Sequence, residues 1–443
     1  MMKIKARILP LPEVKYRGQK NNEVAERVAE MIYFGPKPDE GILYILKDFQ
    51  NQLPSLLADF GVIFKSAPTV FAKPSRNENI EVAMKQTSNE NWQIAIVILN
   101  NVLPEVYESI KQWSNQKLGV PTQCVAVFNH FNEMLANIAC VSQKINTKIG
   151  GINGIVNLKA ALSHSSNEDL FMFVGADITH TTCSTDQPSV AAVVGSCDPT
   201  CSRYAARLSE QYPKIARCAV EIIKELDKMI IDLLQVYERT CGNCLPNRLV
   251  FYRDGVDDEL FQKVLDNKIN KIKDACQVVY GNRKLPRLTF VIIKKSHHTR
   301  FFAYDGQYTK NIEAGTVIDQ DIIHPTQFDF YLCSQAAIMG TSRSALYHVL
   351  HDENEFSSDD IQQLTYWLCH TDARCTKSVS VSAPVHYADL AAYAARMFKF
   401  DDELDHNEET DDLLNETENI SLNDIETKVM IFNDKIQNNM WFV

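Results

Sequence analysis

Apolar runs and amphipathic stretches alternate along the chain from about residue 93. The runs at 92–99 ("WQIAIVIL") and 122–128 ("TQCVAVF") are typical of strands that are buried on both faces. Residues 103–117 and 129–151 have helical spacing of apolar positions, and the second of these stretches ends at paired glycines. Strands that alternate with helices predict a doubly wound α/β unit.

After a polar loop at 162–169 the pattern restarts as a second α/β unit. We therefore predict two α/β domains with a boundary near residue 165. The strands of the second unit are predicted at 170–177, 189–198, 202–209, 248–256 and 287–296, and its helices at about 213–237 and 258–276.

The charge of the chain is unevenly distributed. The net charge is −11 over 443 residues, but residues 401–426 hold 12 acidic residues and no Lys or Arg, so the rest of the chain has a net charge of +1. Such a block is typical of a solvated insertion. The balanced remainder can carry a local basic groove, so the acidic total does not exclude a nucleic-acid partner.

The cysteine content and the hydropathy of the chain indicate the cellular compartment in which the protein is located. The 12 cysteines are scattered, and "CGNC" at Cys241–Cys244 lacks the second pair that a structural zinc site needs. No apolar run reaches the roughly 18 residues of a membrane helix. We expect reduced thiols and a location in the cytoplasm or also the nucleus, without a membrane partner.

Two predicted strands of the second unit end in an aspartate. Asp177 follows "LFMFVGA" and Asp254 follows "RLVFYR". Either residue could be an ordinary turn or capping aspartate. If the strands are neighbours, however, both carboxylates emerge at one sheet edge, where converging carboxylates need a divalent cation such as Mg²⁺ or Mn²⁺. Two such ions roughly 3.5–4 Å apart can promote cleavage of a phosphodiester.

Several longer blocks resemble a known family. They are "GADITH", "PSVAAVVGS", "FYRDGV", "KKSHHTRFF", "AGTVIDQDIIHPTQFDFYLCSQAAIMGTSR", "LTYWLCH" and "RCTKSVSVSAPVHYADLAAYAARM". In this order they are similar to the Piwi domain of eukaryotic Argonaute proteins, and the first 160 residues resemble that family's linker and Mid domain. The resemblance runs to about residue 400 and returns at the C-terminal "MWFV".

The resemblance implies an α/β fold in which a Rossmann-like Mid domain precedes a ribonuclease-H-like Piwi domain. It predicts a linker segment at 1–20, a Mid domain at 21–165 and a Piwi domain at 166–443 with the acidic insertion at 401–426. The N-terminal and Paz domains of a full Argonaute do not precede the linker-like start. We therefore expect a fragment, a truncated gene product or a natural short form.

The resemblance also implies a nuclease that cuts target RNA paired to a small guide RNA, using two Mg²⁺ or Mn²⁺ ions. Its catalytic residues would be Asp177, Glu221, Asp254 and Asp389, with Asp177, Asp254 and Asp389 as metal ligands. Glu225 is an alternative to Glu221, because the segment before it is longer than expected. The alternative function is a cleavage-inactive protein that binds guide and target and represses by recruiting partners.

A guide 5′-phosphate pocket can be predicted in the same way. Tyr107 and Lys111, and likewise Lys144 and Lys148, lie four apart and so face the same side of a helix. The resemblance adds Gln123 to these residues as the phosphate pocket. The resemblance aligns the family's pocket arginine with Ala394, which cannot contact a phosphate. That contact is then made by Arg396, two residues away, or is missing.

Further cations are predicted to contact the RNA backbone. They are Lys294, Lys295, Arg300, Arg374, Lys377 and Arg396. Contacts of this kind depend on salt and not on base sequence. The partners that the resemblance implies are a guide RNA with a 5′ phosphate, a complementary target RNA and tryptophan-containing silencing proteins.

Overall fold

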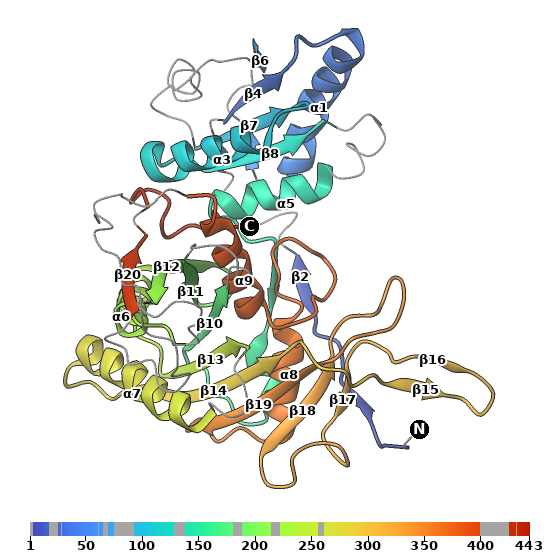
Figure 1. The fold of residues 1–443 in the computed structure, drawn as a ribbon, viewed down its shortest axis with the longest axis vertical. Coiled ribbons are helices and arrows are strands. Elements are labelled where there is room, and N and C mark those ends of the chain that lie inside the picture. The colour runs from blue at the N-terminus through green and yellow to red at the C-terminus, as the bar shows by residue number, and fades with distance from the viewer. Residues whose placement is uncertain are drawn as a thin grey trace, which may run out of the picture.

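The structure is a computed structural model that contains two main sheets (Figure 1). The smaller sheet has four strands, and the larger sheet has ten. The residues that the structure describes are 3–16, 25–27, 29–60, 62–64, 70–74, 93–127, 138–179, 188–213, 222–255, 261–398, 425–430 and 432–443.

The four-stranded sheet is parallel throughout, with the strand order β6-β4-β7-β8. One face packs against α1 and α5, and the other packs against α3 and the π-helical turn η1 that continues it. The elements are β4 (Ala29–Gly35), α1 (Glu40–Ala58), β6 (Val70–Pro74), β7 (Ile94–Leu99), α3 (Pro104–Gln112), η1 (Trp113–Leu118), β8 (Thr122–Ala126) and α5 (Ile138–Lys148). This arrangement confirms the predicted doubly wound unit, although the first part of the helix predicted at 129–151 lies outside the described residues.

The ten-stranded sheet runs in the order β1-β17-β18-β19-β14-β13-β10-β11-β12-β20. Its strands are β1 (Arg7–Ile8), β10 (Phe171–Thr179), β11 (Ser189–Ser196), β12 (Tyr204–Pro213), β13 (Arg248–Asp254), β14 (Arg287–Lys294), β17 (Thr316–Ile318), β18 (Phe328–Cys333), β19 (Ala345–Asp352) and β20 (Ile425–Val429). Smaller two-stranded pairings join β2 (Val14–Tyr16) to β9 (Gly154–Val156), β3 (Ala25–Arg27) to β5 (Val62–Phe64) and β15 (Phe302–Tyr304) to β16 (Thr309–Asn311).

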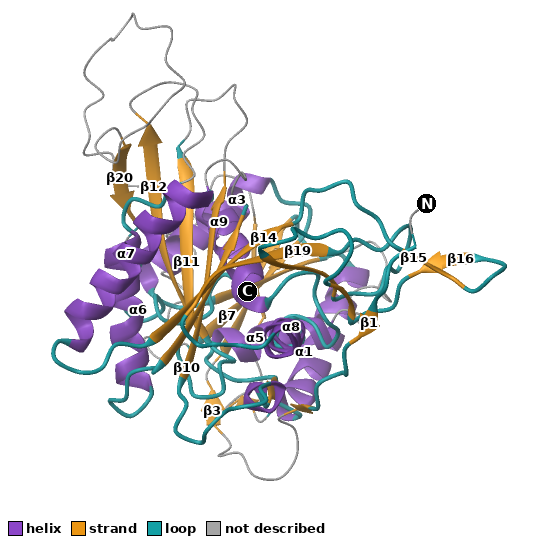
Figure 2. Cartoon of the chain, turned by 90° about the horizontal axis from the view of Figure 1, so that it is seen from below, coloured by secondary structure: helices purple, strands orange, loops and turns teal. Residues whose placement is uncertain are grey.

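Helices cover both faces of the large sheet. Figure 2 shows α6 (Leu226–Thr240) and α7 (Phe261–Tyr280) on one side of the central strands, and their apolar residues form one core cluster with that face. The other face packs against α8 (Ser358–Leu368), α9 (Ala383–Ala395) and the C-terminal aromatic segment. A short 3₁₀ turn, η2 (Leu158–Ala161), also belongs to this side. Burial on both faces explains why β10 and β11 are nearly continuous apolar runs.

The middle of this sheet has the predicted ribonuclease-H-like arrangement. Strand β10 pairs antiparallel with β11, which pairs antiparallel with β12. On its other side β10 pairs parallel with β13, which pairs parallel with β14. The carboxyl ends of β10, β13 and β14 therefore meet at one edge of the sheet, where open α/β sheets place their functional residues.

One predicted helix was wrong at its start. The helix was expected at about 213–237, but residue 213 belongs to β12, whose residues 209–213 pair with β20. Residues 214–221 lie outside the described residues, and α6 is described from Leu226. The partner strand comes from residues 425–429, which are distant in sequence. Propensity near residue 213 could not reveal this pairing.

The predicted linker and the predicted acidic insertion each contribute residues to a strand of the large sheet. Strand β1, inside the predicted linker 1–20, is an edge strand of that sheet. Residues 401–424 of the predicted acidic insertion lie outside the described residues, whereas Ile425 and Glu426 belong to β20. The domain boundaries themselves stay a prediction.

Candidate functional site

Asp177 and Asp254 emerge side by side from neighbouring parallel strands. Ala176 of β10 is in register with Arg253 of β13, so the next residue of each strand is one of the two aspartates. Their exposed fractions are 9% and 8%. The two aspartates therefore lie side by side, as expected from the apolar runs that precede them. The predicted end of the first strand at Asp177 was wrong, because β10 continues to Thr179 through its pairing with β11.

A glycine on β10 allows α9 to approach this edge. A Cβ atom added to Gly175 would lie 2.0 Å from the main-chain carbonyl oxygen of Pro384, in the first turn of α9. The buried face of α9 is rich in alanine, including Ala388 and Ala391, which also favours close packing. Asp389 lies on this helix, so the close approach brings a third carboxylate towards Asp177 and Asp254.

The three aspartates interact electrostatically, and we call Asp177, Asp254 and Asp389 the acidic cluster. The pKa of Asp177 is raised from 3.8 to about 6, mainly by burial and in part by the charges of Asp254 and Asp389, against the opposing effect of Arg253 and Lys295. Crowded carboxylates of this kind favour a proton or a cation in their midst.

Lys295 supplies a cation to this cluster. The residue follows β14, and its Nζ forms an ion pair with Oδ2 of Asp254. Burial would lower the pKa of Lys295, but Asp254, Asp389 and Asp177 outweigh it and raise that pKa. From the sequence we expected Lys295 to contact the RNA backbone, whereas in this structure its side chain contacts the acidic cluster.

The predicted fourth acidic residue is not part of the described cluster. Glu221 lies outside the described residues. The alternative, Glu225, precedes α6, where its carboxylate accepts a hydrogen bond from the Thr427 hydroxyl at 2.9 Å and pairs with Lys228 at 2.5 Å. Its partners thus belong to α6 and β20, and the groups that shift the Asp177 pKa do not include it.

The donor chemistry of the acidic cluster suits a hard divalent cation. Its members offer carboxylate oxygens and no sulfur or imidazole ligand, which is the preference of Mg²⁺ and Mn²⁺. Within the described residues, no group of three or more His, Cys, Asp or Glu side chains is already arranged to hold a metal ion. The residue types therefore fit such an ion, and the side chains would have to draw together around it.

The second set of predicted residues gathers on the small sheet. Lys111 of α3 donates hydrogen bonds from Nζ to the Thr122 carbonyl at 2.8 Å and to its hydroxyl at 3.0 Å. Lys148 of α5 donates to the same carbonyl at 3.2 Å and to Oε1 of Gln123 at 2.8 Å. The Tyr107 ring lies over Lys111, with 5.7 Å from its centroid to Nζ.

The amines of Lys111 and Lys148 are buried, and no carboxylate among the described residues pairs with them. Lys111 and Lys148 have exposed fractions of 7% and 4%. Burial lowers the pKa of Lys148 well below its usual value, and the neighbouring cations Lys111, Lys144 and Arg374 lower it further. We call these four residues the basic cluster. Buried cations that repel one another make a site that an anion would stabilise.

A loop of the large-sheet half of the chain carries Arg374 to this cluster. Asn153, which follows α5, donates a hydrogen bond from Nδ2 to the Ala373 carbonyl at 2.8 Å. Nδ2 also donates to the Gln143 carbonyl and the Thr147 hydroxyl, both at 3.0 Å. From the sequence we expected Arg374 at the RNA backbone and overlooked Asn153, whose sequence signal is its position two residues after the glycine pair at 150–151.

The other residues predicted to contact the RNA backbone do not gather at one place. Arg300 donates hydrogen bonds from its guanidinium to the carbonyls of His297 and Thr299, at 2.8 and 2.7 Å. Lys377 and Arg396 are exposed, and Lys294 at the end of β14 is half-buried. The structure thus brings Arg374 to the basic cluster and Lys295 to the acidic cluster, while Arg300 is held by its own loop.

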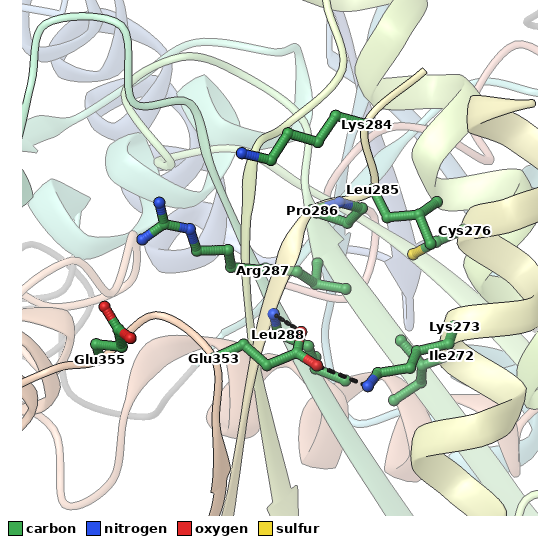
Figure 3. Close-up of a pocket in the computed structure, with 11 residues that line it drawn as sticks. Ile272, Lys273, Cys276, Lys284, Leu285, Pro286, Arg287, Leu288, Glu353 and Glu355 are labelled. Carbon is green, nitrogen blue, oxygen red and sulfur yellow. Dashed lines mark hydrogen bonds and ion pairs between the residues drawn. The ribbon is translucent and has the colours of Figure 1, made fainter. Parts of the chain in front are cut away.

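A separate cavity lies at the opposite end of the strands. It has a volume of about 480 Å³ and is lined where β13 and β14 begin, around Leu249, Arg287 and Leu288. Figure 3 shows Glu353 bridging Lys273 and the Leu288 main chain in this cavity, with distances of 2.6 and 3.0 Å. The acidic cluster is at the other ends of these strands, so the cavity is no part of it.

The chain matches a known domain family over most of its length. Residues 94–399 match the Piwi domain family. In the part of the chain that the structure describes, no helix has the length and apolar character needed to cross a membrane.

Solved structures share the fold over nearly the whole chain. The C-terminal lobe of a budding yeast Argonaute matches with a TM-score of 0.80 and 22% identity, over 99% of this chain and 95% of that chain. Kluyveromyces polysporus Argonaute with a guide RNA matches with a TM-score of 0.78 and 23% identity, over 100% of this chain and 54% of that one. Drosophila Piwi matches with a TM-score of 0.75 and 21% identity, over 99% and 56%.

The chain spans about half the length of the Kluyveromyces and Drosophila proteins. At these identities the structural matches show the fold, whereas the family match covers well over half of the chain. The chain belongs to the Piwi domain family and has the fold of an Argonaute C-terminal lobe.

Proposed function

We propose that this protein holds the 5′-phosphate end of a small guide RNA at the basic cluster and cuts RNA paired to that guide at the acidic cluster. The observation that carries the proposal is the pairing of two opposite sites in one chain. One site collects the buried Lys111 and Lys148, which pair with no carboxylate among the described residues, and the other collects three aspartates at one edge of the sheet. Membership of the Piwi domain family supports a role in RNA-guided silencing.

The chemistry of the basic cluster supports the phosphate assignment. A terminal phosphate carries more charge than an internal phosphodiester, and it would replace mutual repulsion among Lys111, Lys144, Lys148 and Arg374 with charge-assisted hydrogen bonds. Tyr107 offers an aromatic face on which the first base can stack. Gln123 would orient Lys148 through the hydrogen bond that already joins them.

The acidic cluster supports the cleavage assignment. Asp177, Asp254 and Asp389 would hold two Mg²⁺ or Mn²⁺ ions, with Glu221 as the proposed fourth residue. Bound ions of this kind supply an activated water and stabilise charge on the leaving oxygen. For the chain's own part, burial and the acidic neighbours raise the pKa of Asp177 to about 6, so a proton competes with the metal ion for this carboxylate only below about that pH.

A second candidate is a silencing protein that binds guide and target without cutting. Two observations favour it: Lys295 pairs with Asp254, and Glu225 is held by Lys228 and Thr427. In this case repression would depend on recruited proteins, for which we propose the tryptophan-containing partners that the family resemblance suggests. We propose the cytoplasm, or also the nucleus, as the location of either activity.

A cleavage assay separates the two candidates. The purified protein is loaded with a 5′-phosphorylated guide RNA and given a complementary labelled RNA, with Mg²⁺, with Mn²⁺ or with EDTA. The nuclease predicts a single cut that requires a divalent ion and disappears in Asp177→Ala, while guide binding persists. Equal inactivity of wild type and Asp177→Ala, with intact guide binding, would favour the non-cutting protein.

The guide site has its own readout. Fluorescence anisotropy compares the same labelled guide with a 5′ phosphate and with a 5′ hydroxyl. We expect a clear preference for the phosphate that weakens in Lys111→Met. No difference between the two guides would contradict the phosphate assignment whatever the cleavage result.

A further inference from the structure

Lys295 occupies an unusual place beside the acidic cluster. It follows β14, which runs parallel to β13, and Asp254 at the end of β13 is in register with Ile293. Lys295 therefore lies just beyond the same sheet edge as the carboxylate of Asp254. Its side chain is 38% exposed, whereas that of Asp254 is only 9% exposed, so the ammonium reaches inward from the solvent side.

The ammonium interacts with the whole cluster and not with one partner alone. Asp254, Asp389 and Asp177 together overcome the effect of burial on the Lys295 pKa. The other cation that lowers the Asp177 pKa is Arg253, which is 1% exposed and precedes Asp254 on β13. Side chains alternate along a strand, so Arg253 points to the opposite face of the sheet. Of these two cations, Lys295 is thus the one that lies on the same face of the sheet as the carboxylates.

We infer that Lys295 is a resident cation: it neutralises the acidic cluster while no divalent ion is bound, and it must leave Asp254 before a divalent ion can use that carboxylate. The inference rests on the proposed function, since it concerns the same three aspartates. A lysine suits this role because its compact charge sits on a flexible four-carbon stem and can be withdrawn without a change of fold.

After leaving Asp254, the ammonium of Lys295 can bind a second partner. Lys295 is partly exposed at a sheet edge, so on leaving Asp254 it can pair with a phosphate of bound RNA. RNA binding would then free Asp254 for the divalent ion, and ion binding would free Lys295 for the RNA. By linkage, each ligand would tighten the other by the same factor.

The first test measures Mn²⁺ binding without RNA, using the electron paramagnetic resonance signal of the free ion. Lys295→Met should bind Mn²⁺ about tenfold more tightly than wild type, because a competing positive charge has gone. Lys295→Arg keeps the charge and should stay near wild type. Lys273→Met is the matched control, since Lys273 pairs with Glu353 in the distant cavity and its loss should leave Mn²⁺ binding unchanged.

The outcomes distinguish this inference from the proposed function. Asp177→Asn should weaken Mn²⁺ binding, which identifies the acidic cluster as the site measured. If Asp177→Asn weakens binding but Lys295→Met matches wild type or binds more weakly, the role of Lys295 is wrong and the metal site stands. If Mn²⁺ binds to none of the proteins, both the metal site and the role of Lys295 are wrong.

A second measurement leaves Lys295 in place and so does not depend on the folding of a variant. Reductive methylation with ¹³C-formaldehyde keeps the positive charge of each lysine and gives it an NMR signal. On titration of the wild-type protein with Mg²⁺, the Lys295 signal should move as the ammonium leaves Asp254, while the Lys273 signal should not. A Lys295 signal that stays fixed while Mg²⁺ binds would overturn the inference.

Discussion

The amines of Lys111 and Lys148 donate hydrogen bonds to one and the same acceptor, the main-chain carbonyl of Thr122, at 2.8 and 3.2 Å. The two lysines come from different helices and are both almost fully buried. Their other acceptors, the Thr122 hydroxyl and Oε1 of Gln123, are also neutral, so these contacts cannot neutralise two buried ammonium groups. The arrangement is therefore costly in the absence of a ligand, and it prepares the site for an anion.

Lys148→Met should raise the stability of the folded protein and lower its affinity for a 5′-phosphorylated guide. Methionine keeps most of the side-chain volume and removes the buried charge, so urea denaturation should show a variant that is more stable by about 1 kcal/mol. Affinity for a 5′-phosphorylated guide should fall by about 2 kcal/mol, or roughly 30-fold, through loss of a charge-assisted hydrogen bond. Lys47→Met, at an exposed position of α1, is the control and should change neither quantity. A variant that loses stability and keeps its affinity would contradict the picture of a prepared anion site.

Asp177→Asn should stabilise the protein in a way that depends on pH. The folded-state pKa of Asp177 is raised from 3.8 to about 6, so its favourable contribution is complete below 3.8 and is lost as the pH rises through about 6. The variant should therefore match wild type near pH 4 and exceed it above pH 6, by at most about 3 kcal/mol. Denaturation curves in EDTA at several pH values measure this difference. A difference that stays constant with pH would show that the Asp177 charge does not cause it.

Gly175→Ala tests the approach of α9 to β10. The added methyl group would meet the Pro384 carbonyl, which belongs to the backbone and cannot rotate away. We expect a loss of about 2 kcal/mol or more in the free energy of unfolding, and loss of the proposed cleavage because Asp389 moves with the helix. Gly41→Ala in the first turn of α1 is the control, since its new atom would lie 3.4 Å from its nearest neighbour. Wild-type stability in Gly175→Ala would mean that α9 does not pack as tightly as described.

Asn153→Ala tests the connection between the small-sheet helix and the Arg374 loop. The substitution removes the hydrogen bonds to Ala373, Gln143 and Thr147 from a side chain that is 7% exposed. The protein should lose about 2 kcal/mol of stability. The preference for a 5′ phosphate should also fall severalfold, because Arg374 is no longer held at the basic cluster. The exposed Asn157→Ala should leave both measurements at wild-type values, and an unchanged preference in Asn153→Ala would remove Arg374 from the phosphate site.

Local pattern was sufficient for much of the fold. Strands such as β7, β10 and β13 are apolar runs that only a two-sided core can bury, so their existence follows from composition over a few residues. The positions of Asp177 and Asp254 after apolar strand residues follow from the same runs, although only Asp254 is the last residue of its strand, because β10 continues to Thr179. The spacing of Lys111 from Tyr107, and of Lys148 from Lys144, likewise places each pair on one face of its helix.

The tertiary structure alone decided how these pieces meet. Pairing with β20 extends β12 beyond its predicted end at residue 209 to residue 213, where the predicted helix was to begin, because its hydrogen bonds come from residues more than 200 positions away. The contact of Lys295 with Asp254 depends on the parallel neighbourhood of β13 and β14, and the place of Arg374 depends on Asn153. Sequence spacing determines which residues share a strand or helix face. Which of those faces lie opposite one another depends on contacts between residues that are far apart in the sequence, and local spacing carries no information about such contacts. Both charged clusters consist of residues brought together in this way.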